Sequence, residues 1–272
     1  MIEFWQHIYS HINPIAFSFF GFQIHWYAIM YITALIVGYF LGIKFGEKLG
    51  FDKKTIDEYF IWAEIGVILG ARFGYVLFYM PGMQKHYLLH PWEAFNPFVN
   101  GKFVGIAGMS YHGAVIGFAI ATILFCYFKK VNFWKILDVV ALAVPLAYVF
   151  GRIGNFLNGR IVGRVTEMPW GVYIEGALRH PIGIYEAFFE GILSFLVIYL
   201  YYKKFYKCAG ELIGLYLITY GFFRFLCEFW RQPDVQLGFV LGPLTMGQIL
   251  SSFMILFGFI VLVYRRKSCV LK

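Results

Sequence analysis

The stretch WKILDVVALAVPLAYVFGRIGNFL, residues 134–157, is long and apolar enough to cross a membrane, yet an arginine stands near its end. A helix needs about 20 mostly apolar residues to span the hydrocarbon core. An arginine within that core costs at least ~2.5 kcal/mol at the helix centre and therefore needs a partner. Arg152 thus marks this segment both as a membrane span and as part of a candidate functional site.

Similar apolar stretches recur along the whole chain. Of the 272 residues, 60% are hydrophobic, 22% are aromatic and only 14% are charged, whereas about a quarter of the residues of a soluble domain are charged. The sequence therefore predicts an all-α integral membrane protein, with residues 1–272 forming one membrane-embedded domain. Seven transmembrane helices are expected, over residues 24–45, 57–80, 108–128, 134–157, 181–202, 210–231 and 242–264.

The basic residues are concentrated at one end of these spans. Fourteen of the 23 Lys and Arg residues lie there: Lys44, Lys48, Lys53, Lys54, Lys129, Lys130, Lys135, Lys203, Lys204, Lys207, Arg265, Arg266, Lys267 and Lys272. The positive-inside rule then predicts an external N-terminus and a cytoplasmic C-terminus. The net charge of +8 is explained by loops that face anionic headgroups, and it requires no nucleic-acid partner. On the external side, segment 159–180 is a candidate cap.

Three arginines, Arg72, Arg152 and Arg224, lie at a similar depth in spans two, four and six. At 1.5 Å per residue they are roughly 20–26 Å from the cytoplasmic ends, in the outer half of the membrane. Tyr27 and His112 lie near the outer ends of spans one and three. Guanidinium groups gathered at one depth indicate an anionic lipid headgroup, because their planar fork fits phosphate. Alternatively, Arg72 is structural and Arg224 forms an ion pair within its helix.

The densest polar motif is GRIGNFLNGRIVGR, residues 151–164. Arg152 and Asn155 share one helical face at a spacing of three, and Asn158 follows one turn later. The glycines permit close approach of a ligand or a second backbone, although helix packing alone would also explain them. A second stripe, at spacings of four, four and three, runs along the sixth span: Tyr220, Arg224, Glu228 and Arg231. It could hold a phosphodiester or simply stabilise the helix.

Other features are more ambiguous. His112, in GMSYHG (residues 108–113), is a candidate general base for a thiol or hydroxyl, but it could be only an interfacial anchor. A ridge of glycines at a spacing of four, Gly66, Gly70 and Gly74, predicts close helix packing. The four cysteines have no spacing typical of a metal site or a redox motif, so neither a disulfide nor a zinc site is expected.

Taken together, these motifs closely resemble the prolipoprotein diacylglyceryl transferases. The resemblance extends over nearly the whole chain, and its strongest part is Gly151–Gly159, followed by Gly163 and Arg164. The remaining matches are His25-Trp26-Tyr27 with Tyr31, Gly70–Tyr75, Met109–Gly113, Arg179-His180-Pro181, Tyr185-Glu186, Tyr220–Arg224, Glu228 and Arg231-Gln232-Pro233-Asp234.

The resemblance implies an enzyme of the bacterial cytoplasmic membrane with its active site towards the outer leaflet. Such enzymes move the diacylglyceryl group of phosphatidylglycerol to the thiol of the lipobox cysteine in a preprolipoprotein signal peptide. A thioether forms and glycerol 1-phosphate leaves, without a metal or other cofactor. Arg152, Arg224 and His112 would be catalytic. The substrate-binding residues would be Tyr27, Arg72, Asn155, Asn158, Gly163, Tyr220, Glu228 and Arg231.

Three departures from the family pattern limit the transfer of these roles. Arg160 stands where an acidic residue is usual, Ile182-Gly183 replaces a common Ser-Gln, and Ala114 replaces a glycine. The main rival function is an anionic-lipid or anion transporter or scramblase, in which the arginines would bind an anion in transit. An intramembrane serine protease using Ser110 and His112 is less favoured, because Ser110 lacks the usual glycine context.

Overall fold

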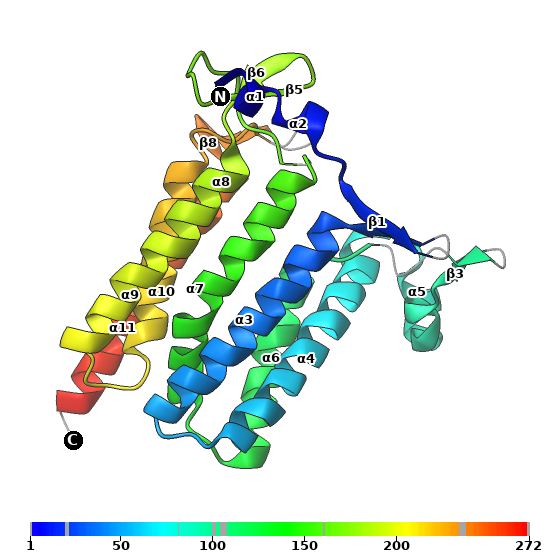
Figure 1. The fold of residues 1–272 in the computed structure, drawn as a ribbon. Helices are drawn as coiled ribbons and strands as arrows, with labels where there is room; N and C mark the ends of the chain where they lie inside the picture. The colour runs from blue at the N-terminus through cyan, green and yellow to red at the C-terminus, as the bar shows by residue number, and fades with distance from the viewer. Residues whose placement is uncertain are drawn as a thin grey trace. The chain divides into compact units, whose positions relative to one another are not determined.

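The fold is helical, and its longest helices coincide with expected spans. The structure, a computed structural model, describes residues 2–19, 22–80, 82–99, 102–103, 108–159, 161–233 and 238–270. Within these residues, six helices are long and apolar enough to cross a membrane. They are α3 (Trp26–Lys48), α4 (Lys53–Tyr79), α6 (Tyr111–Lys129), α7 (Phe133–Leu157), the composite helix Ile182–Lys204 and α11 (Met246–Val270) (Figure 1). The prediction of a helical membrane protein is confirmed. Arg160 and Asp234 lie outside the described residues.

A shorter helix, α10 (Glu211–Cys227), occupies the position of the remaining expected span. Its 17 residues give a length of about 25 Å at 1.5 Å per residue. The sequence predicted a helix as far as residue 231, but α10 ends at Cys227 and the chain then turns. Arg231 instead forms a β-bridge with Gly163. The helix expected from residue 242 begins at Met246, because the short hairpin of β7 (Phe239–Leu241) and β8 (Leu244–Thr245) precedes it.

The described chain divides into two compact units, Met1–Leu49 with Trp134–Lys272, and Gly50–Phe133. In the first unit, the helix after Pro181 is not uniform. It consists of α8 (Ile182–Glu186), a π-helical stretch η2 (Ala187–Leu193) and α9 (Ser194–Lys204). Such π-helical turns are rare and occur frequently at functional sites. This one contains Glu190, whose side chain is completely buried.

The start of α10 is fixed by a side chain from another helix. Gly210 precedes it with a φ of +97°, a conformation that glycine adopts without strain. The Asp138 carboxylate of α7 accepts hydrogen bonds from Gly210 N at 2.6 Å and from Ile213 N at 3.0 Å. These bonds satisfy backbone donors that the first turn of a helix leaves open. They also position α10 relative to α7.

The N-terminal segment contacts the candidate cap region at one end of the first unit (Figure 1). This segment contains α1 (Ile2–Gln6), α2 (Ile8–His11) and the hairpin of β1 (Ile15–Phe19) and β2 (Phe22–His25). Trp5 Nε1 donates to Trp170 O at 2.8 Å, and Tyr9 OH donates to Phe156 O at 2.7 Å. Segment 159–180 itself contains the hairpin of β5 (Val172–Ile174) and β6 (Ala177–Arg179). Burial raises the pKa of Tyr9, so the phenol remains a donor.

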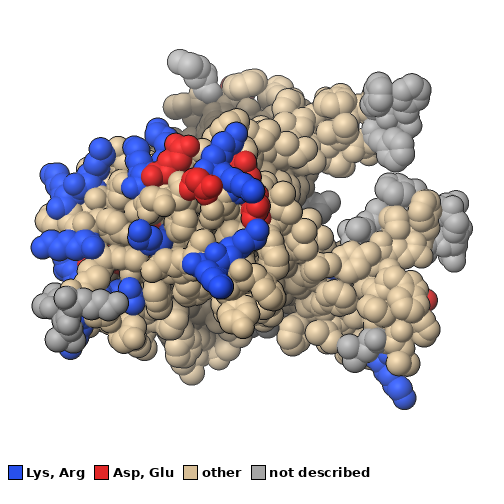
Figure 2. Space-filling view, turned by 90° about the horizontal axis from the view of Figure 1, so that it is seen from below, with Lys and Arg blue, Asp and Glu red and all other residues tan. Residues whose placement is uncertain are grey.

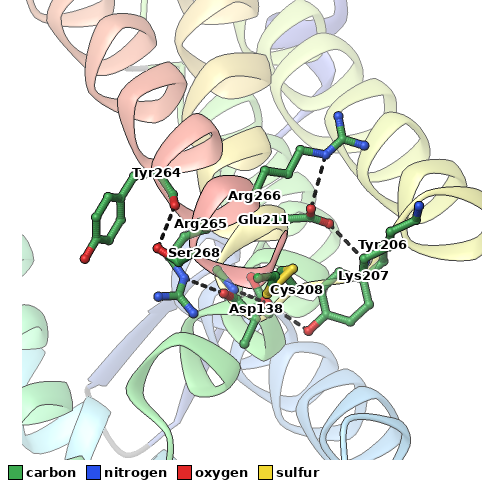
Figure 3. Close-up of a disulfide and its surroundings, with 12 residues drawn as sticks. Asp138, Tyr206, Lys207, Cys208, Glu211, Tyr264, Arg265, Arg266 and Ser268 are labelled. Atoms are coloured by element: carbon green, nitrogen blue, oxygen red, sulfur yellow. Dashed lines mark hydrogen bonds and ion pairs between the residues drawn. A yellow bond between two sulfur atoms is a disulfide. The ribbon is translucent and has the colours of Figure 1, made fainter. Parts of the chain in front are cut away.

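The opposite end of the first unit contains a disulfide that the sequence analysis did not predict (Figure 3). Cys208 is bonded to Cys269, 61 residues later in the chain. Arg265 Nε donates to Ala209 O at 2.7 Å, and Arg266 Nε lies 3.3 Å from Glu211 Oε1. These contacts hold the end of α11 against the loop between α9 and α10. The expectation of no disulfide was wrong because this proximity comes from packing, which cysteine spacing does not reveal.

In the second unit, α4 and α6 pack through glycines. A Cβ added at Gly70 would lie 2.3 Å from Gly113 O, and one at Gly66 would lie 2.6 Å from Gly117 O. Because neither position has room for a methyl group, the predicted glycine ridge is confirmed. Asp52 caps α4 by accepting from Thr55 N at 3.1 Å. The segment between the two helices contains α5 (Gln84–Leu89), the 3₁₀ turn η1 (Pro91–Phe95), β3 (Phe98–Val99) and β4 (Lys102–Phe103).

Basic residues gather at one end of the helices in each unit. In the first unit, α9 ends with Lys203 and Lys204, and the last turn of α11 contains Lys267. In the second unit, α4 begins with Lys53 and α6 ends at Lys129. Figure 2 looks onto the lower end of the view in Figure 1, where α11 ends, and shows blue Lys and Arg side chains gathered on that face. Within each unit, basic residues therefore lie at the helix ends that the sequence predicted to be cytoplasmic.

Candidate active site

One buried carboxylate joins the two arginines that the sequence singled out in the first unit. Arg152, near the end of α7, and Arg224, in the last turn of α10, both contact Glu186 of α8. Arg152 Nη1 lies 2.9 Å from Glu186 Oε2, and Arg224 Nη1 lies 2.9 Å from Glu186 Oε1. The Glu186 side chain is completely buried. The sequence placed Arg152 and Arg224 at one depth, and the structure brings both onto this carboxylate.

Arg231 and Glu228 extend the cluster towards α11. Arg231 Nη1 lies 3.3 Å from Glu186 Oε1, so this carboxylate contacts three guanidinium groups. Glu228 Oε2 lies 2.8 Å from Arg224 Nη2, which is the ion pair expected from their spacing of four residues. The other oxygen of Glu228 accepts from Thr245 Oγ1 at 3.0 Å. Both terminal nitrogens of the Arg224 guanidinium group therefore contact a carboxylate.

A pair of tyrosines links the cluster to Glu190. Arg152 Nε donates a hydrogen bond to Tyr148 OH, which in turn donates a hydrogen bond to Glu190. The Tyr220 hydroxyl lies 3.4 Å from that of Tyr148. Glu190 Oε1 is 3.7 Å from Arg224 Nη1, and Glu190 Oε2 is 3.8 Å from Arg152 Nη2. Tyr220, predicted from the polar stripe on span six, therefore lies beside the arginines.

Within the cluster, Glu186 and Glu190 are fully buried, whereas the guanidinium groups are partly exposed. The side chains of Glu186 and Glu190 are 0% exposed, whereas those of Arg152, Arg224 and Arg231 are 15%, 16% and 19% exposed. The acids fix the orientation of the forks and offset part of the cost of burying them. The guanidinium groups are partly exposed, and phosphate is the anion that the geometry of their forks fits.

The other predicted residues of the motif lie at the end of α7 or on a helix that contacts it. Asn155 follows Arg152 by one helical turn, and Asn158 lies just past the end of α7. Tyr27 is in the first turn of α3, close to α7, because a Cβ added at Gly154 would lie 3.4 Å from Tyr27 Cα. This contact places α3 against α7 two residues after Arg152.

Gly163 is required for backbone packing rather than for side-chain chemistry. A Cβ at this position would lie 2.1 Å from His180 O, so no other residue fits there. Gly163 and Arg231 form a β-bridge, and Arg164 N donates to Trp230 O at 2.8 Å. The bridge fixes the backbone from which the Arg231 side chain reaches Glu186. Nearby, burial lowers the pKa of His180, so its ring favours the neutral form.

Arg72 and His112 belong to the second unit. Arg72 Nε donates to Ala94 O, and Arg72 Nη1 donates to Gly108 O at 3.0 Å. These bonds tie the segment between α4 and α6 to α4, which agrees with the structural alternative for Arg72. His112 is exposed in the first turn of α6, and its ring lies 5.9 Å from that of Tyr111. Ser110 caps α6 by accepting from Gly113 N at 3.2 Å.

Two members of the cluster were missed by the sequence analysis, and a third was noted only as part of a match. Tyr148 and Glu190 were not identified, and Glu186 was not assigned to the site. The available signal was the pair of acids at a spacing of four inside an otherwise apolar span, residues 181–202. Carboxylates within a span are rare and almost always have partners, so the buried arginines could have been matched to them.

Comparison with known proteins gives the family. The family model described as prolipoprotein diacylglyceryl transferase matches residues 14–264. This chain is a member of the prolipoprotein diacylglyceryl transferase family. A relative from Campylobacter hominis, named phosphatidylglycerol–prolipoprotein diacylglyceryl transferase, is 57% identical over 260 residues, covering 95% of this chain and 92% of the relative.

Further relatives with the same name agree with this membership. The relative from Campylobacter jejuni is 56% identical over 262 residues, covering 96% of both chains. The relative from Wolinella succinogenes is 51% identical over 252 residues, covering 92% of both chains. The family match over residues 14–264 therefore begins after α1 and α2 and includes α3 to α10 and most of α11. The resemblance inferred from ordered motifs is confirmed.

Proposed function

We propose that this protein transfers the diacylglyceryl group of phosphatidylglycerol to the thiol of the lipobox cysteine in a preprolipoprotein, as the first step of bacterial lipoprotein maturation. Family membership and relatives of more than 50% identity with this activity in their names support the proposal. Within the molecule, the observation that carries it is the buried cluster in which Arg152 and Arg224 share Glu186 at 2.9 Å. This arrangement suits a phosphate that leaves with growing negative charge.

The reaction is an alkyl transfer. The cysteine sulfur attacks the carbon of the diacylglyceryl group that is bonded to the phosphate oxygen. The bond between this carbon and the oxygen breaks, and glycerol 1-phosphate departs with the bonding electron pair. The thiol must lose its proton to become a strong nucleophile, and we propose His112 as its acceptor. The proton finally resides on the released phosphate or in water, so the balance needs neither an oxidant nor a second substrate.

Arg152 and Arg224 would stabilise the departing phosphate. The charge that develops on the leaving oxygen would meet guanidinium forks already fixed by Glu186 and Glu228. Preorganised donors of this kind are worth about 2.7–4 kcal/mol each in transition-state stabilisation. Because the side chains of both arginines are about 85% buried, water would screen this interaction less than at a surface.

The remaining residues would bind and position the substrates. Tyr220, Asn155 and Asn158 offer hydrogen bonds to the headgroup, and Tyr27 lies on the neighbouring helix. Glu228 and Arg231 would organise the cluster, and Gly163 would fix the backbone beside it. Arg72 would contribute from the second unit by holding the segment that precedes α6, in addition to the substrate contact that the family resemblance implies. None of these roles requires a cofactor.

The chain is a multi-span membrane protein of a family of bacterial inner-membrane enzymes. Within that frame we propose seven spans, with α10 as the sixth, an external N-terminus and a cytoplasmic C-terminus. The active site would face the outer leaflet, with segment 159–180 as an external cap over a single membrane-embedded domain. The basic residues at the ends of α9 and α11 support this orientation.

Two rival functions are weaker. A transporter or scramblase would need to release an anion on both sides, whereas three buried carboxylates hold the arginines in one arrangement. An intramembrane serine protease would need a free hydroxyl nucleophile, but the Ser110 side chain is only 3% exposed and caps α6. Both observations favour the transferase.

A transfer assay tests the proposal. Purified protein is mixed with phosphatidylglycerol and a lipobox peptide, and mass spectrometry measures the diacylglyceryl thioether together with released glycerol phosphate. We expect product from the wild type and little from folded Arg152→Ala or Arg224→Ala. Arg266→Ala is the matched control, because this arginine also pairs with a glutamate but is 53% exposed. Folded wild type that gives no thioether with several peptides would contradict the proposal.

A further inference from the structure

A cluster of metal-type side chains lies outside the arginine cluster, in the segment between α4 and α6. His86, His90 and Glu93 each offer a ligand atom, and these atoms all lie within 4.8 Å of one another. Among the described residues, no other group of three or more histidine, cysteine or acidic side chains has its ligand atoms this close together. The cluster belongs to the second unit, and the proposed transferase mechanism does not use it.

The three residues converge because of the local backbone. His86 lies in α5, and His90 follows at a spacing of four, which places both rings on one side of the helical turn. Their ring centroids are 4.9 Å apart. Pro91 then starts η1, the turn that contains Glu93. The Glu93 carboxylate contacts the His86 ring, with Glu93 Oε2 lying 2.6 Å from His86 Nε2.

A hydrogen bond orients one ligand. His90 Nδ1 lies 3.2 Å from the backbone oxygen of His86. A carbonyl oxygen can only accept, so Nδ1 carries the hydrogen, and the lone pair of the neutral ring is on Nε2. Metal-binding histidines almost always donate their other ring nitrogen to a carbonyl or carboxylate in this way. The arrangement around His90 therefore has the second contact that a metal ligand needs.

The turn that contains Glu93 is anchored to α4. Ala94 is completely buried, and its backbone oxygen accepts from Arg72 Nε. The ring of Phe95 packs edge-on against that of Phe73, with centroids 5.5 Å apart. The two residues that follow Glu93 are therefore held against α4. This contact keeps the Glu93 carboxylate near the imidazoles.

We propose that His86, His90 and Glu93 bind a divalent transition metal of the Zn²⁺ class, with water completing the coordination. Two imidazoles and one carboxylate are a set that zinc accepts in sites with an open position. Hard cations such as Mg²⁺ and Ca²⁺ prefer oxygen ligands and would bind here weakly. The bound metal would replace the hydrogen between His86 and Glu93 and link α5 to η1. Its expected effect is to order this segment.

The proposal does not depend on the transferase activity, and its test uses binding and local order. The purified full chain, freed of any polyhistidine tag and stripped with a chelator, is titrated with Zn²⁺ in detergent against a chromophoric competitor. We expect one tight site per chain. His90→Ala and Glu93→Gln should each weaken it at least ~10-fold, whereas His11→Ala, a change at an exposed histidine of the first unit, should not.

Two further readouts keep the test decisive. Co²⁺ in place of Zn²⁺ should give visible absorption bands of a low-coordinate site in the wild type but not in His90→Ala. Hydrogen exchange should slow in residues 84–95 when Zn²⁺ is added to the wild type, and thermal unfolding checks that each variant remains folded. Wild-type affinity equal to that of both folded variants, or equal loss in His11→Ala, would overturn the proposal.

Discussion

Glu186 is the acid on which the arginine cluster depends most, and replacing it by glutamine tests this. Its carboxylate is completely buried and lies 2.9, 2.9 and 3.3 Å from nitrogens of Arg152, Arg224 and Arg231. Glutamine keeps the shape but not the charge, so three guanidinium groups would face two carboxylates. Loss of one partner from a buried ion pair costs about 3–5 kcal/mol. We expect the stability loss of Glu186→Gln to fall in this range, because the Glu186 carboxylate contacts three guanidinium groups.

The matched control is Glu58→Gln. Glu58 pairs with Lys129, but these side chains are 32% and 43% exposed, so the same change should cost less than about 1 kcal/mol. Unfolding by SDS in mixed micelles, followed by tryptophan fluorescence, measures both variants. We also expect the transfer rate of Glu186→Gln to fall at least ~10-fold, about 1.4 kcal/mol. Equal stability losses in the two variants would refute the reasoning.

Three further predictions concern packing, pH and the disulfide. Gly70→Ala should destabilise the α4–α6 contact by about 1–3 kcal/mol, because the new Cβ would lie 2.3 Å from a backbone oxygen. Its control is Gly151→Ala, whose Cβ would meet nothing within 4 Å, and this variant should be neutral or stabilising in the same unfolding assay. Hydrogen bonds from the side chain and then the backbone of Thr55 lower the pKa of Asp52. The stability that this cap contributes is therefore present above the ordinary aspartate pKa and is lost as pH falls through the lowered value. Asp52→Asn should remove this part of the acid dependence of the unfolding midpoint. In protein purified under oxidising conditions, Cys208→Ser should cost ~4 kcal/mol by the loop-entropy relation for its 61-residue separation. Dithiothreitol should then lower the wild-type midpoint but not that of the variant.

Each of these predictions has a clear contradictory result. Equal midpoints for Gly70→Ala and Gly151→Ala would mean that the two helices can separate without cost. An unchanged acid profile in Asp52→Asn would show that this cap contributes nothing to stability. A wild-type midpoint that is insensitive to dithiothreitol would mean that contacts such as that of Arg265 with Ala209 O hold the end of α11 without the disulfide.

The helical fold could be predicted because each span is encoded locally. About 20 apolar residues and flanking lysines define a span without reference to any other part of the chain. The end of α10 was harder to predict, since Glu228 and Arg231 continue the polar spacing of Tyr220 and Arg224. The helix nevertheless stops at Cys227, because the following backbone pairs with Gly163. That pairing joins residues far apart in sequence, which a periodic pattern cannot show.

The arginines of the site could be predicted from the sequence, but most of their partners could not. A buried arginine is conspicuous in an apolar stretch, so Arg152 and Arg224 were found. Glu190 and Tyr148 were missed because their roles arise from side chains that meet across helices. The same limit explains the disulfide, whose cysteines lie in the α9–α10 loop and at the end of α11. In these cases the sequence contains the residue types, whereas their partners are set by tertiary packing.

We propose that Arg224 acts on the departing phosphate more than on lipid binding. The most direct measurement compares wild type with folded Arg224→Ala in single-turnover transfer to a lipobox peptide, with phosphatidylglycerol binding measured separately. We predict a loss of ~10²–10³ in the rate of transfer and a change of less than ~10-fold in the dissociation constant of the lipid. A large loss of binding with an unchanged rate at saturating lipid would contradict the account.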